Sequence, residues 1–319
     1  MKLIEKARRH ASIASGNFAR LFAGAEIPPL PATVSRLVKE VGKDEPDLQR
    51  ISELITATPE IAAKVLQTVN SAYFALPKPV SSIMRAVTML GLRQIRPLIL
   101  SFSMKKSLSP ANDSLFDQQG FWSDALLKAL IARALADKCC RDEREEAFTA
   151  MLLADIALPM LLTAWGEYYT PVIQQWQVEQ TRLSHAEQAS FKWDHAQAGA
   201  WILQSWEFPP ELVCLVGLHN TDLEKLRQIG LEDSAALPVT IAALVPSSLR
   251  PGAQRAQQMI DTATSQLPLD FSALAEILGQ VRADFQEICG LFDLTPELGL
   301  LALEALDQVL VRQGVEVAS

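Results

Sequence analysis

Hydrophobic positions along this chain recur with helical spacing. Val34, Leu37, Val38 and Val41 fall at i, i+3, i+4 and i+7, which places them on one face of a helix. Shorter stripes of the same kind predict further helices around residues 51–55, 61–69, 83–90 and 92–99. The signals for strands are weak, because extended alternating runs and Asn-Gly or Asp-Gly hairpin turns between apolar runs are missing from the sequence. The pattern therefore predicts an all-α fold.

Capping residues predict where several of these helices begin and end. Pro59 suits the first turn of a helix, where its missing N–H would have no partner in any case. Ser81 or Ser82 can cap the helix that follows them, and Gly91 stands at its C-terminal end. Pro97 is expected to bend the next helix.

Longer helices are predicted in the second half of the chain. They cover residues 121–140, 144–165, 184–206, 209–219, 270–291 and 295–314. Asp270 and Thr295 are the expected N-caps of the last two helices, and Pro296 suits a first helical position. A more polar, proline-containing stretch near 220–238 indicates a boundary, and no repeat of 20–50 residues is found.

Length and composition narrow the class of protein. The chain has 319 residues, 49% of them hydrophobic, which is enough for a sizeable core and excludes a disordered chain. No apolar run approaches the ~18 residues that span a bilayer, and residues 1–6 lack the apolar core of a signal peptide. The four cysteines, including the adjacent pair Cys139 and Cys140, form neither a disulfide framework nor a CxxC pair. We therefore expect no membrane insertion and a cytoplasmic location.

The charge distribution is uneven. The net charge is −8, which argues against a protein that coats nucleic acid. Residues 61–112 contain no Asp or Glu and carry +7, so the remainder carries −15. This segment is a candidate surface for an anionic partner, formed by Arg85, Arg93, Arg96, Lys105 and Lys106. The opposing interpretation is that these cations point in different directions and pair with acids elsewhere.

Several blocks in the first half resemble the HDOD domain, an HD-related output domain of bacterial signalling proteins. The blocks are Ile27-Pro28-Pro29-Leu30-Pro31, Thr58-Pro59-Glu60 with the residues up to Leu66, Val69-Asn70-Ser71-Ala72-Tyr73-Phe74, and Ala86 to Leu92. The signature segment of the family is carried by Asn70, Ser71, Ala72, Pro77, Ser81, Ser82 and Gly91.

The second half resembles the part of this family that is related to HD-superfamily metal phosphohydrolases. The similar segments contain Asp124, the Ala154-Asp155 pair, the Asp194-His195 pair and the His219-Asn220 pair. Asp124 stands where many relatives have His, Ala154 replaces the His of the name-giving His-Asp pair, and Asn220 replaces a second His.

These departures bear on catalysis. A hydrolase of that class needs several His and Asp ligands for its metal ions, and Ala154 cannot bind a metal. The resemblance therefore implies a degraded centre with no catalytic residue, no metal and no cofactor. Residues at these positions are predicted to line a vestigial pocket: Asp124, Asp155, His195, His219 and Asn220. The structural alternative is that Asp155 is a packing or capping carboxylate and His195 is bonded within a helical interface.

The resemblance implies a multi-helix HD-like bundle. We predict an N-terminal helical segment (1–24), an HDOD domain (25–220, divided into 25–112 and an HD-like part 113–220) and a C-terminal helical extension (221–319).

Three functions follow from these observations. The first is a non-enzymatic signalling module that binds a protein partner, with the segment 70–83 as a candidate contact surface. The second is a residual metal-dependent phosphohydrolase that uses Asp124, Asp155, His195 and His219. The third is a regulator that binds nucleic acid or a cyclic nucleotide through residues 61–112.

Overall fold

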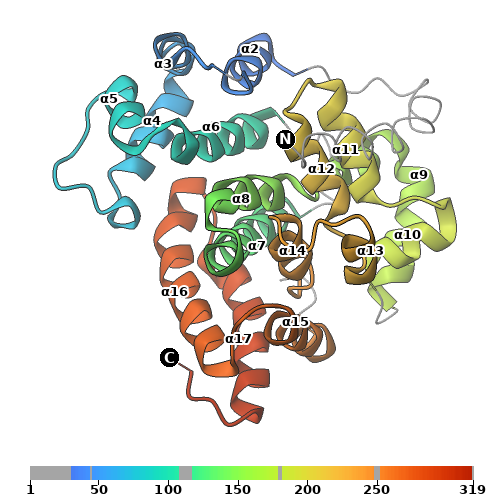
Figure 1. Ribbon diagram of the computed structural model, residues 1–319. Coiled ribbons are helices and arrows are strands. Elements are labelled where there is room, and N and C mark those ends of the chain that lie inside the picture. Colours follow the sequence, from blue (N-terminus) through green and yellow to red (C-terminus); the bar gives the residue numbers. More distant parts are fainter. Residues whose placement is uncertain (1–29, 44, 108–116, 179–181, 248–251, 318–319) are drawn as a thin grey trace.

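The protein is all-α, as the sequence predicts. The computed structural model describes residues 30–43, 45–107, 117–178, 182–247 and 252–317, and within these residues it has sixteen α-helices, three 3-10 helices and no β-strand (Figure 1). The predicted N-terminal segment 1–24 lies outside the described residues.

The first layer of helices follows the predicted stripes. It consists of α2 (Ala32–Val41), α3 (Leu48–Thr56), α4 (Pro59–Val69), η1 (Ala72–Phe74), α5 (Ile83–Leu90) and α6 (Leu92–Ser107). Asp47 caps α3 by accepting hydrogen bonds from the backbone N–H groups of Gln49 and Arg50. Ser82, rather than Ser81, caps α5, which ends at Gly91 with a positive φ of 81° that glycine adopts readily. Pro97 lies inside α6, which continues beyond it.

The centre of the molecule is the helix α7 (Gln118–Cys139). Its buried residues lie on all sides rather than along one stripe, which is typical of a helix surrounded by others. It contacts α8 (Arg144–Leu153), α14 (Ala236–Ala242), α16 (Phe271–Cys289) and α17 (Pro296–Arg312).

Two helices that the sequence predicts as continuous are broken. The segment 144–165 is divided by a turn at 154–156 into α8 and α9 (Ala157–Val178). The physical reason is Pro159, whose ring would clash with the carbonyl of Asp155 in a continuous helix. The segment 184–206 is divided into α10 (Leu183–Phe191) and α11 (His195–Ser205). The prediction of single helices is wrong at both places.

The rest of the chain adds five short or medium helices. They are η2 (Arg141–Glu143), α12 (Pro210–Leu218), α13 (Leu223–Gln228), η3 (Gly290–Phe292) and α15 (Ala253–Gln266). The polar stretch 220–238 contains α13 and the start of α14, and α15 was not predicted. The domain limits given above stay a prediction.

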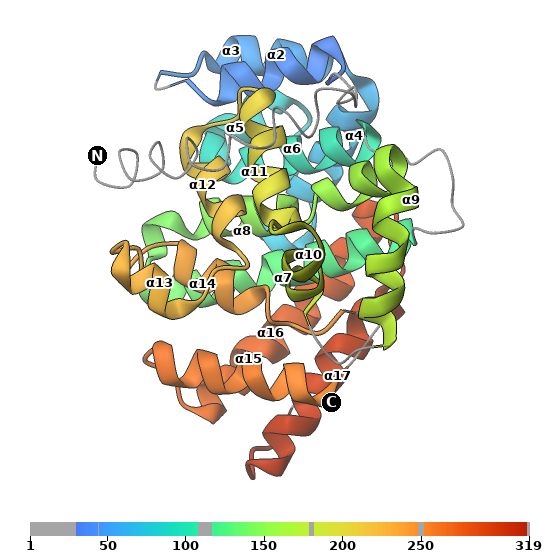
Figure 2. The same cartoon turned by 90° about the vertical axis from the view of Figure 1, so that its right-hand side faces the viewer.

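The C-terminal helices pack on the first half of the chain. Figure 2 shows α15 and α17 at the opposite end of the molecule from α2 and α3, and η3 reaches back to α4. Lys64 forms an ion pair of 2.6 Å with Asp293, and the ring centroids of Phe102 and Phe292 are 4.5 Å apart. Helices α2 to α17 therefore share one buried core.

One stretch has the length and composition of a membrane-spanning helix. It is Arg141–Thr163, and 72% of its most apolar window is buried inside the protein. Core helices of soluble proteins often share this length and composition, and most of this stretch lies in the buried core.

Replacing Phe292 with alanine should test the packing of the C-terminal helices. The ring is almost completely buried, so its removal should lower the free energy of unfolding by ~3–5 kcal/mol in a urea titration. Leu301→Ala is the matched control, because Leu301 is 41% exposed and its loss should change stability by well under ~1 kcal/mol. Equal effects of the two substitutions would contradict the shared core.

Candidate functional site

Asp155 is positioned by the break between α8 and α9. The turn at 154–156 places Ala154 in the core, and the Asp155 side chain retains 15% exposure toward a cavity. The backbone N–H of Ala154 bonds to the Met151 carbonyl three residues earlier, which tightens the end of α8. In a continuous helix the Asp155 side chain would point in a different direction, so the break between α8 and α9 creates the site.

His195 is positioned by the break between α10 and α11. Lys192 adopts a left-handed conformation (φ 66°) and ends the first helix. Asp194 then caps the second helix in a capping box with Gln197, so that His195 is the first helical residue. The His195 side chain is buried, as is the backbone around it.

His219 lies at the C-terminal end of α12, whereas His195 lies at the N-terminal end of α11. It is the C-cap residue of α12, and only 1% of it is exposed. Its Nδ1 atom lies 2.7 Å from the Val216 carbonyl, which can only accept a hydrogen bond. The Nδ1 atom therefore carries the proton, and the Nε2 atom points into the site.

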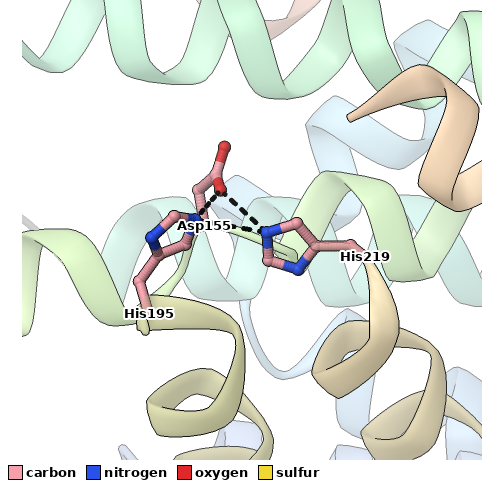
Figure 3. Close-up of side chains that lie close together, drawn as sticks. All are labelled: Asp155, His195 and His219. Carbon is pink, nitrogen blue, oxygen red and sulfur yellow. Dashed lines mark hydrogen bonds and ion pairs between the residues drawn. The ribbon is translucent and has the colours of Figure 1, made fainter. Parts of the chain in front are cut away.

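Three side chains converge at this point (Figure 3). The Nε2 atom of His195 lies 3.2 Å from Asp155 Oδ1 and 3.2 Å from His219 Nε2, and the His219 Nε2 atom lies 3.4 Å from the same carboxylate oxygen. Because three acceptor atoms at such distances repel one another when the rings are neutral, the site favours a positive charge, either a proton or a metal ion.

Glu187, on α10, holds His195 from behind. Its fully buried carboxylate accepts hydrogen bonds from the His195 Nδ1 atom (2.6 Å) and from the His195 backbone N–H (3.0 Å). The Tyr169 hydroxyl donates to the other carboxylate oxygen. Sequence reasoning missed Glu187, because nothing in its segment distinguishes it from a surface glutamate of an amphipathic helix.

Lys128 supplies a fixed positive charge on the other side. Its Nζ atom lies 3.3 Å from Asp155 Oδ2, and both side chains are largely buried. Sequence reasoning missed this residue too, although a signal existed. Lys128 interrupts an apolar run in α7 and follows Asp124 by four residues, on the same face of the helix.

The charges of this cluster stabilise one another. Burial alone would raise the pKa of Asp155, but Lys128 and the two histidines hold it well below its usual range. Burial likewise opposes the charge on His195, yet the carboxylates of Glu187 and Asp155 raise the pKa of this histidine to about 10. The two carboxylates therefore favour a proton on His195 in the chain without a metal ion.

All five residues predicted for the vestigial pocket line one cavity of about 160 Å³. Asp124 is not part of the close cluster, and its carboxylate accepts a hydrogen bond from Ser247 (2.6 Å). The Oδ1 atom of Asn220 accepts a hydrogen bond from Arg182 (2.8 Å), and its amide nitrogen lies 3.0 Å from His195 Nε2. Apolar side chains of α9, such as Leu158 and Leu162, form another wall of the cavity.

The residues present fit one metal ion and not two. Within the described residues, Asp155, His195 and His219 are the one group of three or more potential ligands whose atoms lie within 4.8 Å of one another. The carboxylate of Glu187 behind His195 has the place of an outer-shell partner. Ala154 offers no donor, and Lys128 occupies the second oxygen of Asp155.

The family-signature residues form a separate structural unit. The Asn70 side chain donates to the Val80 carbonyl (2.8 Å) and accepts from the Val80 N–H (2.7 Å), which closes the intervening loop. Ser71 bonds to the Thr68 carbonyl, and the backbone N–H of Tyr73 donates to Glu287 of α16. Ala72, Pro77 and Ser81 are exposed. Part of this segment is thus covered by the chain itself.

The predicted anion surface is divided by ion pairs and burial. Arg93 pairs with Glu146 (3.2 Å), and burial lowers the pKa of Arg96. Lys105 donates to the Phe292 carbonyl, whereas Arg85 is exposed. The Lys106 side chain lies outside the described residues. Binding of an anionic partner stays a prediction, and the described cations do not form one exposed cluster.

Comparison with known proteins identifies one domain family in this chain. The sequence profile of the HDOD domain matches residues 27–221. An uncharacterized protein of Treponema pallidum (strain Nichols) is 24% identical over 198 residues, which cover 61% of this chain and 38% of that relative. The chain thus spans less than half the length of this curated relative.

Solved structures share the fold. A candidate phosphohydrolase of Shewanella amazonensis SB2B aligns with a TM-score of 0.60 and 21% identity, covering 88% of this chain and 95% of its own. A candidate signal transduction protein of Marinobacter aquaeolei VT8 aligns with a TM-score of 0.58 and 18% identity, covering 96% and 66%. At these identities the likeness establishes the helical architecture alone.

Replacing His195 with asparagine should remove a pH-dependent part of the stability. The pKa of His195 is about 10 in the folded chain, against 6.5 for a free histidine. Because the folded state holds this proton more tightly, the stabilisation is complete below pH 6.5 and is lost as the pH rises through 10.

Urea titrations of the wild type and His195→Asn at several pH values would measure this effect. The difference in unfolding free energy between the two proteins should shrink from pH 6.5 to 10, by at most ~1.4 kcal/mol per pH unit. A difference that stays constant over this range would contradict the assigned charge state.

Proposed function

The chain belongs to the HDOD domain family, and we propose that it works as a regulatory signal-transduction module that binds a protein partner and does not catalyse hydrolysis. The proposal includes a cytoplasmic location and no bound cofactor. The observation that carries it is the contact at Asp155, where the ammonium of the internal Lys128 lies 3.3 Å from one carboxylate oxygen.

The position of Lys128 supports the loss of hydrolytic chemistry. Two-metal phosphoryl transfer requires cations on both the attacking and the leaving oxygen. Here the Lys128 ammonium binds one carboxylate oxygen of Asp155, and Ala154 stands where relatives have a histidine. A lysine of this kind neutralises the carboxylate but cannot polarise a water molecule as a divalent ion does.

The exposed part of the signature segment supports partner binding. Lys78 lies in the loop that Asn70 closes, and Arg85 and Met89 lie four residues apart on one face of α5. Met89 is 44% exposed, which is unusual for a large apolar side chain in this protein. A loop closed by two hydrogen bonds, followed by a helix with an exposed apolar residue, is a suitable contact surface, because a closed loop loses little conformational entropy on binding.

A second candidate function is a phosphohydrolase with one divalent ion. The convergence of Asp155, His195 and His219 favours it, because a carboxylate and two imidazoles are common ligands of transition metals. An ion held there would supply Lewis-acid polarisation of a phosphoryl oxygen. Glu187 would keep His195 in the tautomer that presents Nε2, and the cavity wall offers the guanidinium groups of Arg182 and Arg255 for a phosphate.

Assays of hydrolysis distinguish the two functions. The full chain is incubated with p-nitrophenyl phosphate and bis(p-nitrophenyl) phosphate in the presence of Mn²⁺, Fe²⁺ or Zn²⁺. We expect the wild type and Asp155→Ala to give the same background rate, because the proposed function uses no metal. Metal-dependent turnover that is at least ~100-fold faster in the wild type than in Asp155→Ala would replace the first function by the second.

Partner binding can be tested with matched surface variants. The full chain, carrying a photo-crosslinker at position 78, is exposed to extracts of its native host, and the crosslinked proteins are identified by mass spectrometry. One protein should be captured by the wild type, and its capture should fall by at least ~10-fold in Met89→Asp, because a charge there opposes burial.

The control is Leu48→Asp on α3, where the side chain is similarly exposed (40%) but lies outside the signature segment. Retained capture by this control is expected. Equal loss in both variants, or no protein that depends on Met89, would refute the proposed surface.

A further inference from the structure

Two adjacent cysteines stand at the end of the central helix. Cys139 is the last residue of α7 and is exposed, and Cys140 is its partly exposed C-cap residue. Their sulfur atoms are 3.5 Å apart. The remaining cysteines, Cys214 and Cys289, are buried. The chain therefore has one accessible pair of thiols at close range.

The two thiols differ in their access to solvent. Cys139 is exposed and lines a surface depression, whereas Cys140 is only partly exposed and does not line it. The contact between the two sulfur atoms also favours the thiolate of Cys139, whose pKa is lowered. Because the accessible thiolate is the nucleophile in thiol chemistry, Cys139 is suited to attack and Cys140 to resolve.

Access to Cys139 is provided by a shallow depression on the surface. It is lined by Cys139 itself, by Arg227 of α13 and by Gln266 of α15, and its volume is about 460 Å³. Lys138 and Arg227 contribute positive charge, and Glu232 and Asp233 contribute negative charge. A small zwitterionic peptide disulfide would find complementary groups here.

We propose that Cys139 and Cys140 form a redox modification site that is oxidised by low-molecular-weight disulfides. The Cys139 thiolate attacks one sulfur of the disulfide, so that a mixed disulfide forms and one thiolate leaves. The Cys140 thiol then loses its proton to solvent and attacks the Cys139 sulfur, which releases the second thiolate. The two cysteines are oxidised to one disulfide, and the small disulfide is reduced to two thiols.

Oxidation would alter the end of α7. Adjacent Cα atoms are ~3.8 Å apart across a trans peptide, less than the ~4.4–6.8 Å usual for disulfides, so the ring is strained and easily reduced. The Cys140 N–H donates to the Ala136 carbonyl (2.8 Å) and closes the last turn of the helix. Closing the ring would turn the 139–140 peptide and weaken this bond.

That change lies beside a contact between distant segments. Glu143, three residues after the pair, accepts a hydrogen bond of 2.7 Å from the backbone N–H of Ala235. Ala235 directly precedes α14, one of the helices packed on α7. Oxidation of the pair would therefore change the structure at the contact between α7, η2 and α14. This inference is independent of the function proposed above.

The test uses the reduced full chain in glutathione buffers of increasing oxidised-to-reduced ratio. We expect two of the four thiols to be lost, and peptide mass spectrometry to find an intramolecular disulfide between Cys139 and Cys140. In Cys140→Ser the reaction should stop at one glutathione on Cys139, and in Cys139→Ser adduct formation should slow by at least ~10-fold. Cys214→Ser is the control and should behave as the wild type.

Three results would overturn the proposal. The first is that both thiols survive the most oxidising buffer. The second is that Cys139 pairs with a cysteine of another molecule instead of Cys140. The third is that Cys139→Ser and Cys140→Ser form glutathione adducts at the same rate, since this would remove the division into an attacking and a resolving thiol.

Discussion

The burial of α7 is the constraint on which the rest of the structure depends. A helix that is apolar on all sides must be surrounded, and α8, α14, α16 and α17 surround it. The polar side chains of α7 then contact polar groups of the elements packed around it. Lys128 meets the Asp155 turn, and Arg133 meets Glu145 and the Tyr73 hydroxyl. The pocket and the anchoring of the signature segment are thus two results of one packing arrangement.

The pocket is a problem in charge balance. Asp155 and Glu187 are carboxylates in a low-dielectric environment, where an uncompensated charge is expensive. A metal ion is one way to compensate them. The Lys128 ammonium, 3.3 Å from Asp155 Oδ2, is another. Ala154 offers no metal ligand and Lys128 lies beside Asp155, so the charge of this carboxylate is compensated from within the chain.

Much of the fold could be predicted from the sequence, because helical periodicity depends on residues three and four positions apart along the chain. The stripe that begins at Val34 and the caps at Ser82 and Asp270 are local signals, and the structure confirms them. The breaks before Asp155 and His195 were missed, although Pro159 and the Asp194–Gln197 capping box stand in the sequence. The apolar positions on both sides of each break kept a helical spacing, and this spacing led to the prediction of one continuous helix at each place.

The candidate site was only partly predictable for a different reason. Its members Asp155, His195 and His219 could be found from the family pattern, but the residues that set their charge state could not. Glu187 and Lys128 act across helix interfaces, and the distances that make them partners exist only after packing. The spacing shows that Lys128 shares a helix face with Asp124, but it does not show that this face meets Asp155.

The docking of η3 against α6 has a consequence for how this protein can change over evolution. The family match ends at residue 221, yet the Phe102 ring is covered by Phe292, and the Tyr73 backbone is bonded to Glu287. A gene fusion that transplanted only the matched segment would expose an aromatic surface and leave a backbone donor without its acceptor. The segment that must be transferred to keep the fold is therefore longer than the segment that matches the family. A transferred copy needs the C-terminal helices as well, or another element that covers the same surface.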